Sequence, residues 1–495
     1  MRKLLIANRG EIAVRIIRAC RELGVSCVAV YSDADRLAPH VMLADEAHRI
    51  GEAPSSASYL KADVLIETAL RSGCDAIHPG YGFLSERAHF AEAVEASGLI
   101  FVGPSASAIA AMGDKTEARR RMMAAGVPIV PGIAEAVADA NDARVAARDI
   151  GYPVLLKAAA GGGGKGMRVV QNDGEMARAF EGATHEAGAS FGDSSIYLEK
   201  YLEHPRHIEV QVLADAYGNA VHLGERECSI QRRHQKLVEE APSSVLSPGQ
   251  RAAMGEAAVA AARAVGYRNA GTIEFLWQDG DYYFLEMNTR IQVEHPVTEL
   301  VTGKDLVQWQ IRIASGETLD FVQSDVHLAG HAIECRITSE DGFAGFLPST
   351  GRIERLDVPA GPGVRWDAGI LEGSEVSLYY DPLLAKLIVH ATDRSAAIER
   401  MLRALSELDV AGVETSAGFL RRVMAEPDFR NGQFDIRYLE THRELFAPAS
   451  GESTLRMVAL AAALLEHEAR KRRATERIET QENPQNGWRS RGWRP

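Results

Sequence analysis

The sequence predicts a multidomain protein that combines α/β with α+β architecture, and three observations support this prediction. The chain has 495 residues, enough for roughly three or four domains. Its first part alternates short apolar strands with amphipathic helices, which is typical of a parallel sheet covered by helices. Further along, longer strands joined by hairpin turns replace this alternation, and strands and helices mix again after residue 330.

The composition excludes several classes of protein. Lys and Arg number 55 and Asp and Glu number 68, so the formal net charge of −13 disfavours nucleic acid as a partner. No apolar run reaches the ~18 residues of a membrane helix, and charges follow the first Met too closely for a secretory signal. The five cysteines show no CxxC pair and no zinc spacing, which suits a reducing compartment. We therefore expect a cytoplasmic protein that binds neither membranes nor nucleic acid.

The N-terminal region is predicted to form the parallel sheet. An amphipathic helix is expected over residues 11–23, where Ile12, Ile16 and Ala19 share one face. The segment HPGYGFLSE, residues 78–86, is interpreted as a connecting loop that leads into a helix. The predicted strands are residues 3–7, 26–31, 76–78 and 99–102.

A glycine-rich loop, AAAGGGGKGMRVV, follows a strand predicted at residues 153–157. A P-loop would enter a helix, whereas here Lys165 is followed by Gly166 and a second strand, so the glycines form the tip of a hairpin. Such a loop can close over phosphates with its backbone N–H groups. Because Lys157 stands just before the loop and could reach the same anion, we favour a phosphate lid over a merely flexible turn.

A second hairpin is predicted from strands at residues 272–277 and 282–293. By the period-two rule, the second strand would present one polar face, opposite Met287, Ile291 and Val293. Glu274 would lie opposite Glu286 if the loop had three residues, and on the other face if it had two. The predicted polar row is Glu286, Asn288, Arg290, Gln292 and Glu294.

This row carries the residue types of a metal and anion site. Two opposed carboxylates, Glu274 and Glu286, repel unless a cation such as Mg²⁺ neutralises them, and Asn288 could add a third ligand. Arg290 offers a planar fork for an oxyanion, and Glu294 is well placed as a base. An ordinary solvated strand face is the alternative.

The stretch SIQRRHQKLVE, residues 229–239, is dense in hydrogen-bond donors, which suits nucleotide and anion binding. It follows a strand at residues 207–213 in which His207, Glu209 and Gln211 share one face. If the stretch is extended, Gln231 and Lys236 point to opposite faces. Taken alone, such a run is more often a solvated edge.

Six motifs together are specific for one family: ANRGEIAVRIIRA, HPGYGFLSE, KAAAGGGGKGM, PRHIEVQV, SIQRRHQKLVEEAP and EMNTRIQVEHPVTE. The chain resembles biotin carboxylase, the ATP-grasp component of biotin-dependent carboxylases, from residue 1 to about 446. The resemblance implies a Rossmann-like, pre-ATP-grasp N-terminal domain and a C-terminal mixed α/β domain on either side of an ATP-grasp domain. The implied limits are 1–114, 115–329 with a lid at about 131–204, 330–446, and a helical extension and linker over 447–495.

The resemblance also implies a reaction, in which ATP phosphorylates bicarbonate to carboxyphosphate and biotin takes up the CO₂ that is released. The cofactors would be ATP and Mg²⁺ or Mn²⁺. The implied ATP-binding residues are Lys115, Lys157, Gly162, Gly163, Gly164, Glu199, Lys200, Leu202, His207, Gln231, His234, Glu274 and Glu286. The implied metal ligands are Glu274, Glu286 and Asn288. The implied bicarbonate site is Lys236, Arg290, Gln292, Val293 and Glu294. The implied catalytic residues are Glu294 as base, Arg290, Lys236 and Arg336. Biotin would meet Arg336 and Asp381.

The biotin-accepting Met-Lys-Met does not occur in the sequence, so we expect biotin from a separate biotin carboxyl carrier protein or domain. The extension after residue 447 resembles the one downstream of the carboxylase module in α subunits of acyl-CoA carboxylases, of acetyl-, propionyl- or methylcrotonyl-type, which implies a carboxyltransferase β subunit and an oligomeric complex. We favour such an α chain, or a fragment of one, over the free-standing biotin carboxylase subunit of an acetyl-CoA carboxylase. Three alternatives stay open: a subunit of a pyruvate or 2-oxo acid carboxylase, another ATP-grasp ligase that joins a carboxylate to an amine, and an inactive assembly scaffold. The complete row from Glu286 to Glu294, together with Arg336, disfavours the last two.

Overall fold

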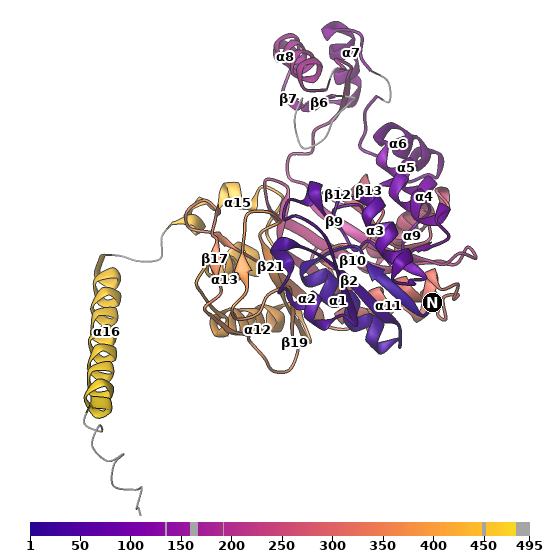
Figure 1. Cartoon of the computed structure of the whole chain (residues 1–495). Coiled ribbons are helices and arrows are strands. Elements are labelled where there is room, and N and C mark those ends of the chain that lie inside the picture. The colour runs from indigo at the N-terminus through magenta and orange to yellow at the C-terminus, as the bar shows by residue number, and fades with distance from the viewer. Residues whose placement is uncertain (134–135, 159–166, 192, 448–451, 482–495) are drawn as a thin grey trace, which may run out of the picture. The chain divides into compact units, whose positions relative to one another are not determined.

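The computed structural model describes residues 1–133, 136–158, 167–191, 193–447 and 452–481. These residues form two compact units, Met1–Leu445 and a second that begins at Phe446 (Figure 1). The domain limits inferred from the sequence stay predictions, because the first unit spans all three predicted domains. None of the helices in the described ranges combines the length and hydropathy that a membrane span requires.

The N-terminal part is a five-stranded, wholly parallel sheet of order β3-β2-β1-β4-β5, as predicted. The strand β3 was not among the predicted strands. The apolar face of α1 is buried, including Ile12, Ile16 and Ala19. The strands are β1 Lys3–Ile6, β2 Ser26–Ser32, β3 Glu46–Gly51, β4 Ala76–His78 and β5 Ile100–Phe101. The helices are α1 Gly10–Glu22, α2 Pro39–Leu43, α3 Ala62–Arg71, α4 Ala88–Ala96 and α5 Ala106–Gly113.

The centre of the first unit is an eight-stranded sheet of order β13-β12-β9-β10-β11-β14-β21-β19. It runs without a break across the predicted limit at residue 329, because β11 pairs with β14. The strands are β9 Arg206–Ala214, β10 Ala220–Arg232, β11 Gln235–Ala241, β12 Asn269–Gln278, β13 Asp281–Asn288, β14 His331–Thr338, β19 Val364–Ala368 and β21 Leu383–Ala391. The helices that pack on it include α9 Pro248–Ala264, α10 His295–Thr302 and α12 Arg394–Glu407.

The two faces of β9 differ in chemistry, and this difference positions the site. Ile208, Val210 and Val212 enter an apolar core together with α9. The other face carries His207, Glu209 and Gln211, which are buried but hydrogen-bonded. The sequence predicted this division of β9 into an apolar and a polar face.

A three-stranded sheet, β7-β6-β8, carries the predicted glycine hairpin. Its strands are β6 Val154–Ala158, β7 Met167–Val170 and β8 Ile196–Lys200, and its helices are α7 Ala140–Ile150 and α8 Asp173–Phe191. The antiparallel pairing of β6 with β7 confirms the hairpin. Its tip, with Gly162, Gly163, Gly164 and Lys165, lies outside the described residues.

The remaining elements are short, apart from the last. The short helices are α6 Lys115–Ala124, α11 Leu306–Ala314, α13 Ala417–Ala425, α14 Pro427–Arg430 and α15 Tyr438–Thr441. Three strand pairs complete the first unit: β15 Glu340–Asp341 with β16 Leu347–Pro348, β17 Gly351–Arg352 with β20 Glu375–Val376, and β18 Arg355–Asp357 with β22 Asp409–Ala411. The second unit contains the predicted C-terminal helix, α16 Glu452–Gln481. The linker predicted beyond it lies outside the described residues.

Candidate active site

Strand pairing sets four charged residues in one row across the large sheet. Arg226 of β10 pairs with Glu209 of β9, Glu209 pairs with Glu274 of β12, and Glu274 pairs with Glu286 of β13. Directly opposed residues of antiparallel strands share a face. Three adjacent carboxylates on one face require cations, and the row itself supplies only Arg226.

The pairing of Glu274 with Glu286 arises differently from the prediction. The turn has two residues, Asp279 and Gly280, with φ of 54° and 99°, and β12 pairs regularly with β13 as far as Phe275 opposite Phe284. A two-residue turn alone would place the two carboxylates on opposite faces. The register shifts between Glu274 and Phe275, so Leu285 is an extra residue, a β-bulge that turns Glu286 back toward Glu274.

The prediction of one extended polar row as far as Val293 was wrong. Strand β13 ends at Asn288, and α10 begins at His295, with Glu294 as its N-cap residue and a proline in its first turn. The alternating pattern continues through this segment, but Pro296 has no backbone N–H for a ladder and favours the first turn of a helix. Arg290, Gln292 and Glu294 therefore reach the site from a turn and not from a strand face.

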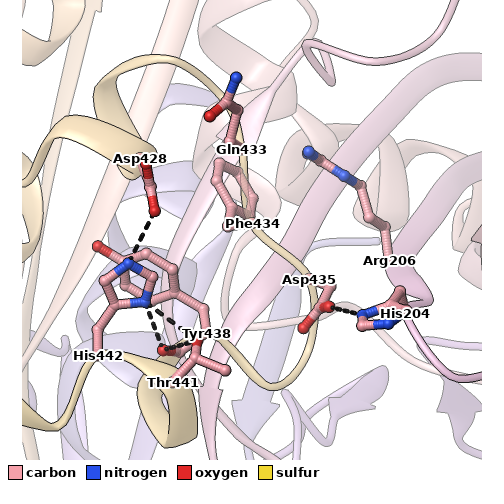
Figure 2. Close-up of a pocket in the computed structure, with 9 residues that line it drawn as sticks. All are labelled: His204, Arg206, Asp428, Gln433, Phe434, Asp435, Tyr438, Thr441 and His442. Atoms are coloured by element: carbon pink, nitrogen blue, oxygen red, sulfur yellow. Dashed lines mark hydrogen bonds and ion pairs between the residues drawn. The ribbon is translucent and has the colours of Figure 1, made fainter.

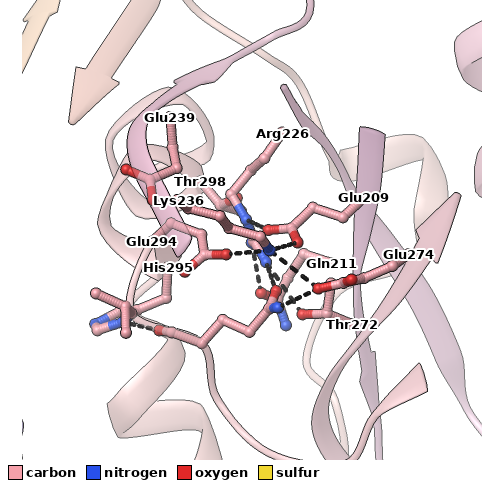
Figure 3. A network of polar contacts seen from close by, with 12 residues as sticks. Glu209, Gln211, Arg226, Lys236, Glu239, Thr272, Glu274, Glu294, His295 and Thr298 are labelled. Atoms are coloured by element: carbon pink, nitrogen blue, oxygen red, sulfur yellow. Dashed lines mark hydrogen bonds and ion pairs between the residues drawn. The ribbon is translucent and has the colours of Figure 1, made fainter. Parts of the chain in front are cut away.

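Lys236 lies at the centre of this site (Figure 3). Its Nζ donates to Glu209 Oε2 at 2.6 Å, to Glu274 Oε1 at 3.0 Å and to Glu294 Oε1 at 2.6 Å. Burial alone would lower the pKa of Lys236, but these three carboxylates outweigh it and hold that pKa well above its usual value. Burial would likewise raise the pKa of Glu294, yet Lys236 and Arg336 hold it well below the ordinary range. Lys236 is thus an ammonium and Glu294 a carboxylate at neutral pH.

Beneath Lys236, the guanidinium of Arg226 is fully buried and joins the row to the turn before α10. It donates to Glu209 Oε1 at 2.5 Å, to Gln211 Oε1 at 2.7 Å and to Gln292 Oε1 at 2.7 Å. Its further bonds, at 3.0–3.1 Å, go to hydroxyls of Thr298 and Thr272. The sequence reading missed Arg226, because a basic residue in the middle of a strand gives no signal of burial.

Glu274 is the most heavily bonded carboxylate of the row. It accepts hydrogen bonds from Asn288 at 2.8 Å and Gln292 at 2.8 Å, and His207 Nε2 lies 2.9 Å from its Oε2. Burial opposes ionisation of Glu274, but Lys236 and His207 hold its pKa well below the ordinary value. Ligand atoms of His207, Glu209 and Glu274 lie within 4.8 Å of one another.

Glu286, at the end of the row, is the carboxylate with the least support. Its side chain is exposed, and no residue in the described part of the chain donates a hydrogen bond to it. Partial loss of hydration among the surrounding groups, followed by the charge of Glu274, raises its pKa. A divalent cation with oxygen ligands would relieve this repulsion, and Glu274, Glu286 and the Asn288 carboxamide are ligands that Mg²⁺ accepts. These donors therefore fit the predicted metal.

Arg290 joins the site to the HPGYGFLSE segment, which the sequence reading treated as a connection only. Arg290 Nε donates to Glu86 Oε2 at 3.1 Å and its Nη2 donates to Asn288 Oδ1 at 2.9 Å. In the same segment, the Tyr81 hydroxyl donates to Glu11. The loop is therefore part of the site, because it fixes the arginine that was predicted to hold an oxyanion.

Arg336 of β14 reaches Glu294 from the other side. Its Nε donates to Glu239 Oε1 at 2.6 Å and its Nη2 to Glu294 Oε2 at 2.8 Å. Its Nη1 donates to none of the described residues, and the side chain is 17% exposed. The predicted biotin residue Asp381 is exposed, and its Oδ1 accepts from the backbone N of Leu383.

The predicted nucleotide residues are held more loosely. Lys157 Nζ donates to Glu199 Oε1 at 2.5 Å, and the charge of Glu199 raises the pKa of Lys157 although burial opposes this. Lys200 Nζ donates to two backbone carbonyls, of Gly151 and Tyr152, at 3.0 and 2.9 Å. Lys115 is the first residue of α6 and is exposed. Leu202 follows β8 and is partly buried.

The donor-rich stretch after Ser229 is not extended throughout, so the condition under which Gln231 and Lys236 would point to opposite faces is not met. It folds into a hairpin whose two turn residues, Arg233 and His234, have φ of 48° and 66°. The hairpin places Gln231 opposite Lys236, so both belong to one face. His234 lies exposed at the turn.

A cavity of about 440 Å³ lies apart from this site, and its lining contains none of the predicted site residues (Figure 2). On one side His442 Nε2 lies 3.0 Å from Asp428 Oδ2, and on the other His204 Nδ1 lies 2.9 Å from Asp435 Oδ2. The pair His204–Asp435 ties the segment between α14 and α15 to the chain just before β9, and the pair His442–Asp428 ties the end of α15 to α14. We assign them a structural role.

Comparison with known proteins identifies the family. Residues 1–109 match the model of the biotin carboxylase N-terminal domain, and residues 334–441 that of the biotin carboxylase C-terminal domain. Residues 114–322 match the ATP-binding domain of the carbamoyl-phosphate synthase L chain. The chain is 53% identical to biotin carboxylase 1 of Bacillus subtilis over 89% of its own length and 99% of the relative's.

Two further relatives extend the match. The propionyl-CoA carboxylase alpha chain of Ruegeria pomeroyi is 50% identical over 97% of this chain and 74% of its own length. The crystal structure of the biotin carboxylase domain dimer of Hydrogenobacter thermophilus 2-oxoglutarate carboxylase, in complex with MgADP, ADP and bicarbonate, superposes with a TM-score of 0.84. It shares 51% identity and covers 91% of this chain and 99% of its own. The row of carboxylates, the lysine that bridges them and these matches lead to one conclusion. The chain belongs to the biotin carboxylase family and is an ATP-dependent carboxylase.

Proposed function

We propose that the residues around Lys236 activate bicarbonate toward ATP, and that Arg336 receives biotin next to them. The observation that carries this proposal is the shared carboxylate: Lys236 and Arg336 both bond Glu294, each to a different oxygen. A base placed between two cations can take a proton from an anionic acid such as bicarbonate, whose charge the same cations attract.

In the proposed activation step, bicarbonate binds to Lys236 and Arg290, with Gln292 and the backbone of Val293 completing the site. As bicarbonate draws the ammonium of Lys236 toward itself, Glu294 loses part of the interaction that depresses its pKa and becomes a stronger base. The Val293 carbonyl is fixed by Lys386 Nζ at 2.8 Å, so the turn that carries the base cannot drift. The bicarbonate oxygen that Glu294 has deprotonated then attacks the γ-phosphorus of ATP, the bond from that phosphorus to the β,γ-bridging oxygen breaks, and ADP leaves as carboxyphosphate forms.

The nucleotide would lie against the β6–β8 sheet and the row of glutamates. Lys157 and Lys115 would bind the phosphates of ATP, and Glu199 and Leu202 would flank its adenine ring. The nucleotide site would be completed by His207, Gln231 and His234. Glu274, Glu286 and Asn288 would hold Mg²⁺ or Mn²⁺, which supplies neutralising charge to the phosphates when bound. Bonds from His207 and Lys236 keep Glu274 ionised for this role.

The biotin step would use the free edge of Arg336. Nε and Nη2 are occupied by Glu239 and Glu294, so Nη1 can donate to the ureido oxygen as negative charge develops on it. Asp381 lies at the margin of the same region, because its negative charge contributes to the raised pKa of the Tyr81 hydroxyl, on which Arg336 also acts. Biotin would arrive on a carrier protein or domain.

We further propose that the chain serves an acyl-CoA carboxylase as its α-type subunit, together with a carboxyltransferase β subunit. The match to the Ruegeria pomeroyi propionyl-CoA carboxylase alpha chain covers 97% of the chain, against 89% for the Bacillus subtilis biotin carboxylase. The helix α16, with exposed Met457, Leu460 and Leu464, lies beyond residue 441, where the match to the biotin carboxylase C-terminal domain ends. A role with a 2-oxo acid carboxylase is the alternative.

Phosphate release from ATP and Mg²⁺, measured with and without bicarbonate and then with free biotin, tests the proposed function. We expect turnover that requires bicarbonate and rises with biotin. Turnover without bicarbonate dependence would favour a ligase that joins a carboxylate to an amine. Pull-down of a carboxyltransferase subunit by the full chain, and its absence with residues 1–445 alone, tests the proposed partner.

A further inference from the structure

A second layer of buried charge lies behind Arg336. Pairing of β11 with β14 sets Glu239 opposite Glu334, and pairing of β14 with β21 sets Arg336 opposite Lys386. Residues 334 and 336 are two apart on one strand, so all four side chains share a face. The helix α10, which carries the base at its N-terminus, packs against these three strands.

Glu334 is the one member of this layer without hydrogen bonds. It is 0% exposed, and neither carboxyl oxygen has a partner among the described residues. Glu239, also 0% exposed, gives one oxygen to Arg336, and its second oxygen is unbonded. A buried carboxylate without donors is among the most costly groups in a protein, whereas the neutral acid is not. The neutral acid is also a hydrogen-bond donor.

The cations near Glu334 are already engaged. The charged groups that face it are Glu239 from β11, Arg336 on its own strand, Lys386 from β21 and Glu294 from the start of α10. Lys386 donates to the Val293 carbonyl and lies 3.2 Å from Glu11, while Arg336 is divided between Glu239 and Glu294. Burial accordingly raises the pKa of Glu334 well above its usual value, and Lys386 does not offset this. Burial also raises the pKa of Glu239 to about 7, against the opposing charge of Arg336.

We propose that Glu334 remains a neutral carboxylic acid in the working enzyme, and that Glu334 and Glu239 are positioning residues for Arg336. When Glu334 is neutral, no anion lies opposite Glu239, so Glu239 can stay ionised and accept the hydrogen bond from Arg336 Nε. If Glu334 ionised, it would draw Arg336 away from Glu294, or Lys386 away from the Val293 carbonyl. Either shift would move the base or the biotin-facing edge of Arg336, so loss of this proton sets the alkaline limit of biotin carboxylation. This inference rests on the proposed roles of Arg336 and Glu294.

Glu334→Gln tests the proposal, because glutamine keeps the shape of the neutral acid and cannot ionise. We expect a near wild-type kcat with free biotin at pH 7, an unchanged KM for ATP, and an alkaline decline of kcat displaced upward by about one pH unit. Glu240→Gln is the matched control: Glu240 is buried on β11, next to Glu239, but is bonded to His331 and Arg394 at 2.9 and 2.8 Å. The control should leave the pH profile where it is. A profile of Glu334→Gln that coincides with wild type contradicts the positioning role.

A second measurement tests the protonation state without using activity. Unfolding lets Glu334 ionise at its ordinary pKa, so the stability of the wild type falls as pH rises from that value toward the raised folded-state pKa. The Glu334→Gln variant does not lose stability in this way, because the glutamine amide does not ionise. We expect the melting temperature of Glu334→Gln minus that of wild type to increase steadily from pH 5 to pH 8. A difference that is constant over this range would show that Glu334 is already ionised in the folded protein. If the wild type hydrolysed ATP without bicarbonate, the proposed function would fall, while this thermal comparison would still decide the state of Glu334.

Discussion

Lys157 and Lys236 both face glutamates, and the two lysines are supported very differently. Lys157, at the proposed nucleotide side, meets Glu199, and among the described residues the other cation that Glu199 pairs with is Arg119 at 3.5 Å. Lys236 meets three carboxylates, and each of these has a second bonded partner: Arg226 for Glu209, His207 for Glu274 and Arg336 for Glu294. The reacting centre is therefore fixed before substrate arrives, whereas the nucleotide side can rearrange as ATP enters and ADP leaves. The predictions below test this difference between a fixed centre and an adaptable entrance.

The largest effect is expected at the base. Glu294→Gln should lower bicarbonate-dependent turnover about 10³-fold, because the amide cannot take the proton, while ATP affinity changes little. Phosphate release against bicarbonate, together with nucleotide binding by calorimetry, measures both. Glu256→Gln, an exposed glutamate on α9, serves as the control. Undiminished turnover in Glu294→Gln would remove this residue from the mechanism.

Lys236→Met should lower both the efficiency with which bicarbonate is used and the stability of the folded protein. We expect kcat/KM for bicarbonate to fall about 10²-fold, and the unfolding free energy at pH 7 to drop by about 3–5 kcal/mol, because three buried carboxylates lose their common cation. In the folded wild type, the pKa values of Glu274 and Glu294 are depressed. Their ionisation therefore stabilises the fold at any pH above the ordinary carboxylate pKa, and this stabilisation is lost as the pH falls from there through the folded-state pKa values. The deficit should therefore shrink between pH 7 and pH 3 in denaturant titrations, with the change confined to pH values below the ordinary carboxylate pKa of 4.5. An equal deficit at both pH values would argue against a cation-supported centre.

Arg336→Lys should separate the biotin step from the phosphate step. Lysine keeps the charge but lacks the planar guanidinium that bonds Glu239 and Glu294 through two nitrogens and holds a third in a fixed direction. We expect biotin-dependent turnover to fall about tenfold, with the bicarbonate-dependent ATPase measured without biotin nearly unchanged. A loss confined to ATP affinity would show that the role of Arg336 has been misread.

At the adaptable entrance, Lys157→Met should have a smaller effect. Its interaction with phosphate competes with the existing pair to Glu199, so we expect the KM for ATP to rise only about fivefold, with kcat retained. Lys304→Met, whose ammonium lies over the ring of Phe321, is a matched control. A loss in kcat as large as that of Lys236→Met would erase the distinction between the two lysines.

The smallest effect on the chemistry is expected from removal of residues 446–495. This unit is separate from the one that contains every described site residue, so carboxylation of free biotin should stay within twofold of the full chain. Steady-state assays of the two proteins side by side provide the check. A folded but inactive shorter chain would assign the second unit a direct part in catalysis.

The sequence predicted much of the fold because burial patterns there are local. The parallel N-terminal sheet, the division of β9 into two faces and the hairpin β6–β7 all follow from apolar spacing and turn residues. The end of β13 was predicted wrongly because polar and apolar residues keep alternating through Val293, although the chain has already left the strand. Pro296, early in α10, was the available signal of a helix start.

The site was predictable in its residue types but not in its geometry. Lys236 was expected near bicarbonate, yet its contacts with Glu209 and Glu274 depend on pairing between strands that are distant in sequence. Arg226 carries no local sign of its burial, since its five bonds come from β9, β12 and the region of α10. Glu86 was passed over because its loop resembles a simple connection until Arg290 is placed against it.

The bulge at Leu285 makes the β12–β13 hairpin sensitive to chain length more than to side-chain identity. Substituting Tyr282 or Tyr283 changes one contact, whereas deleting either residue would rotate Glu286 to the opposite side of the sheet with every side chain of the site still present. A chain of this kind tolerates point mutation in the hairpin but not a single-residue insertion or deletion. An engineer who wishes to graft a new turn here must therefore conserve the count of residues between Glu274 and Glu286, and may choose the residues themselves more freely.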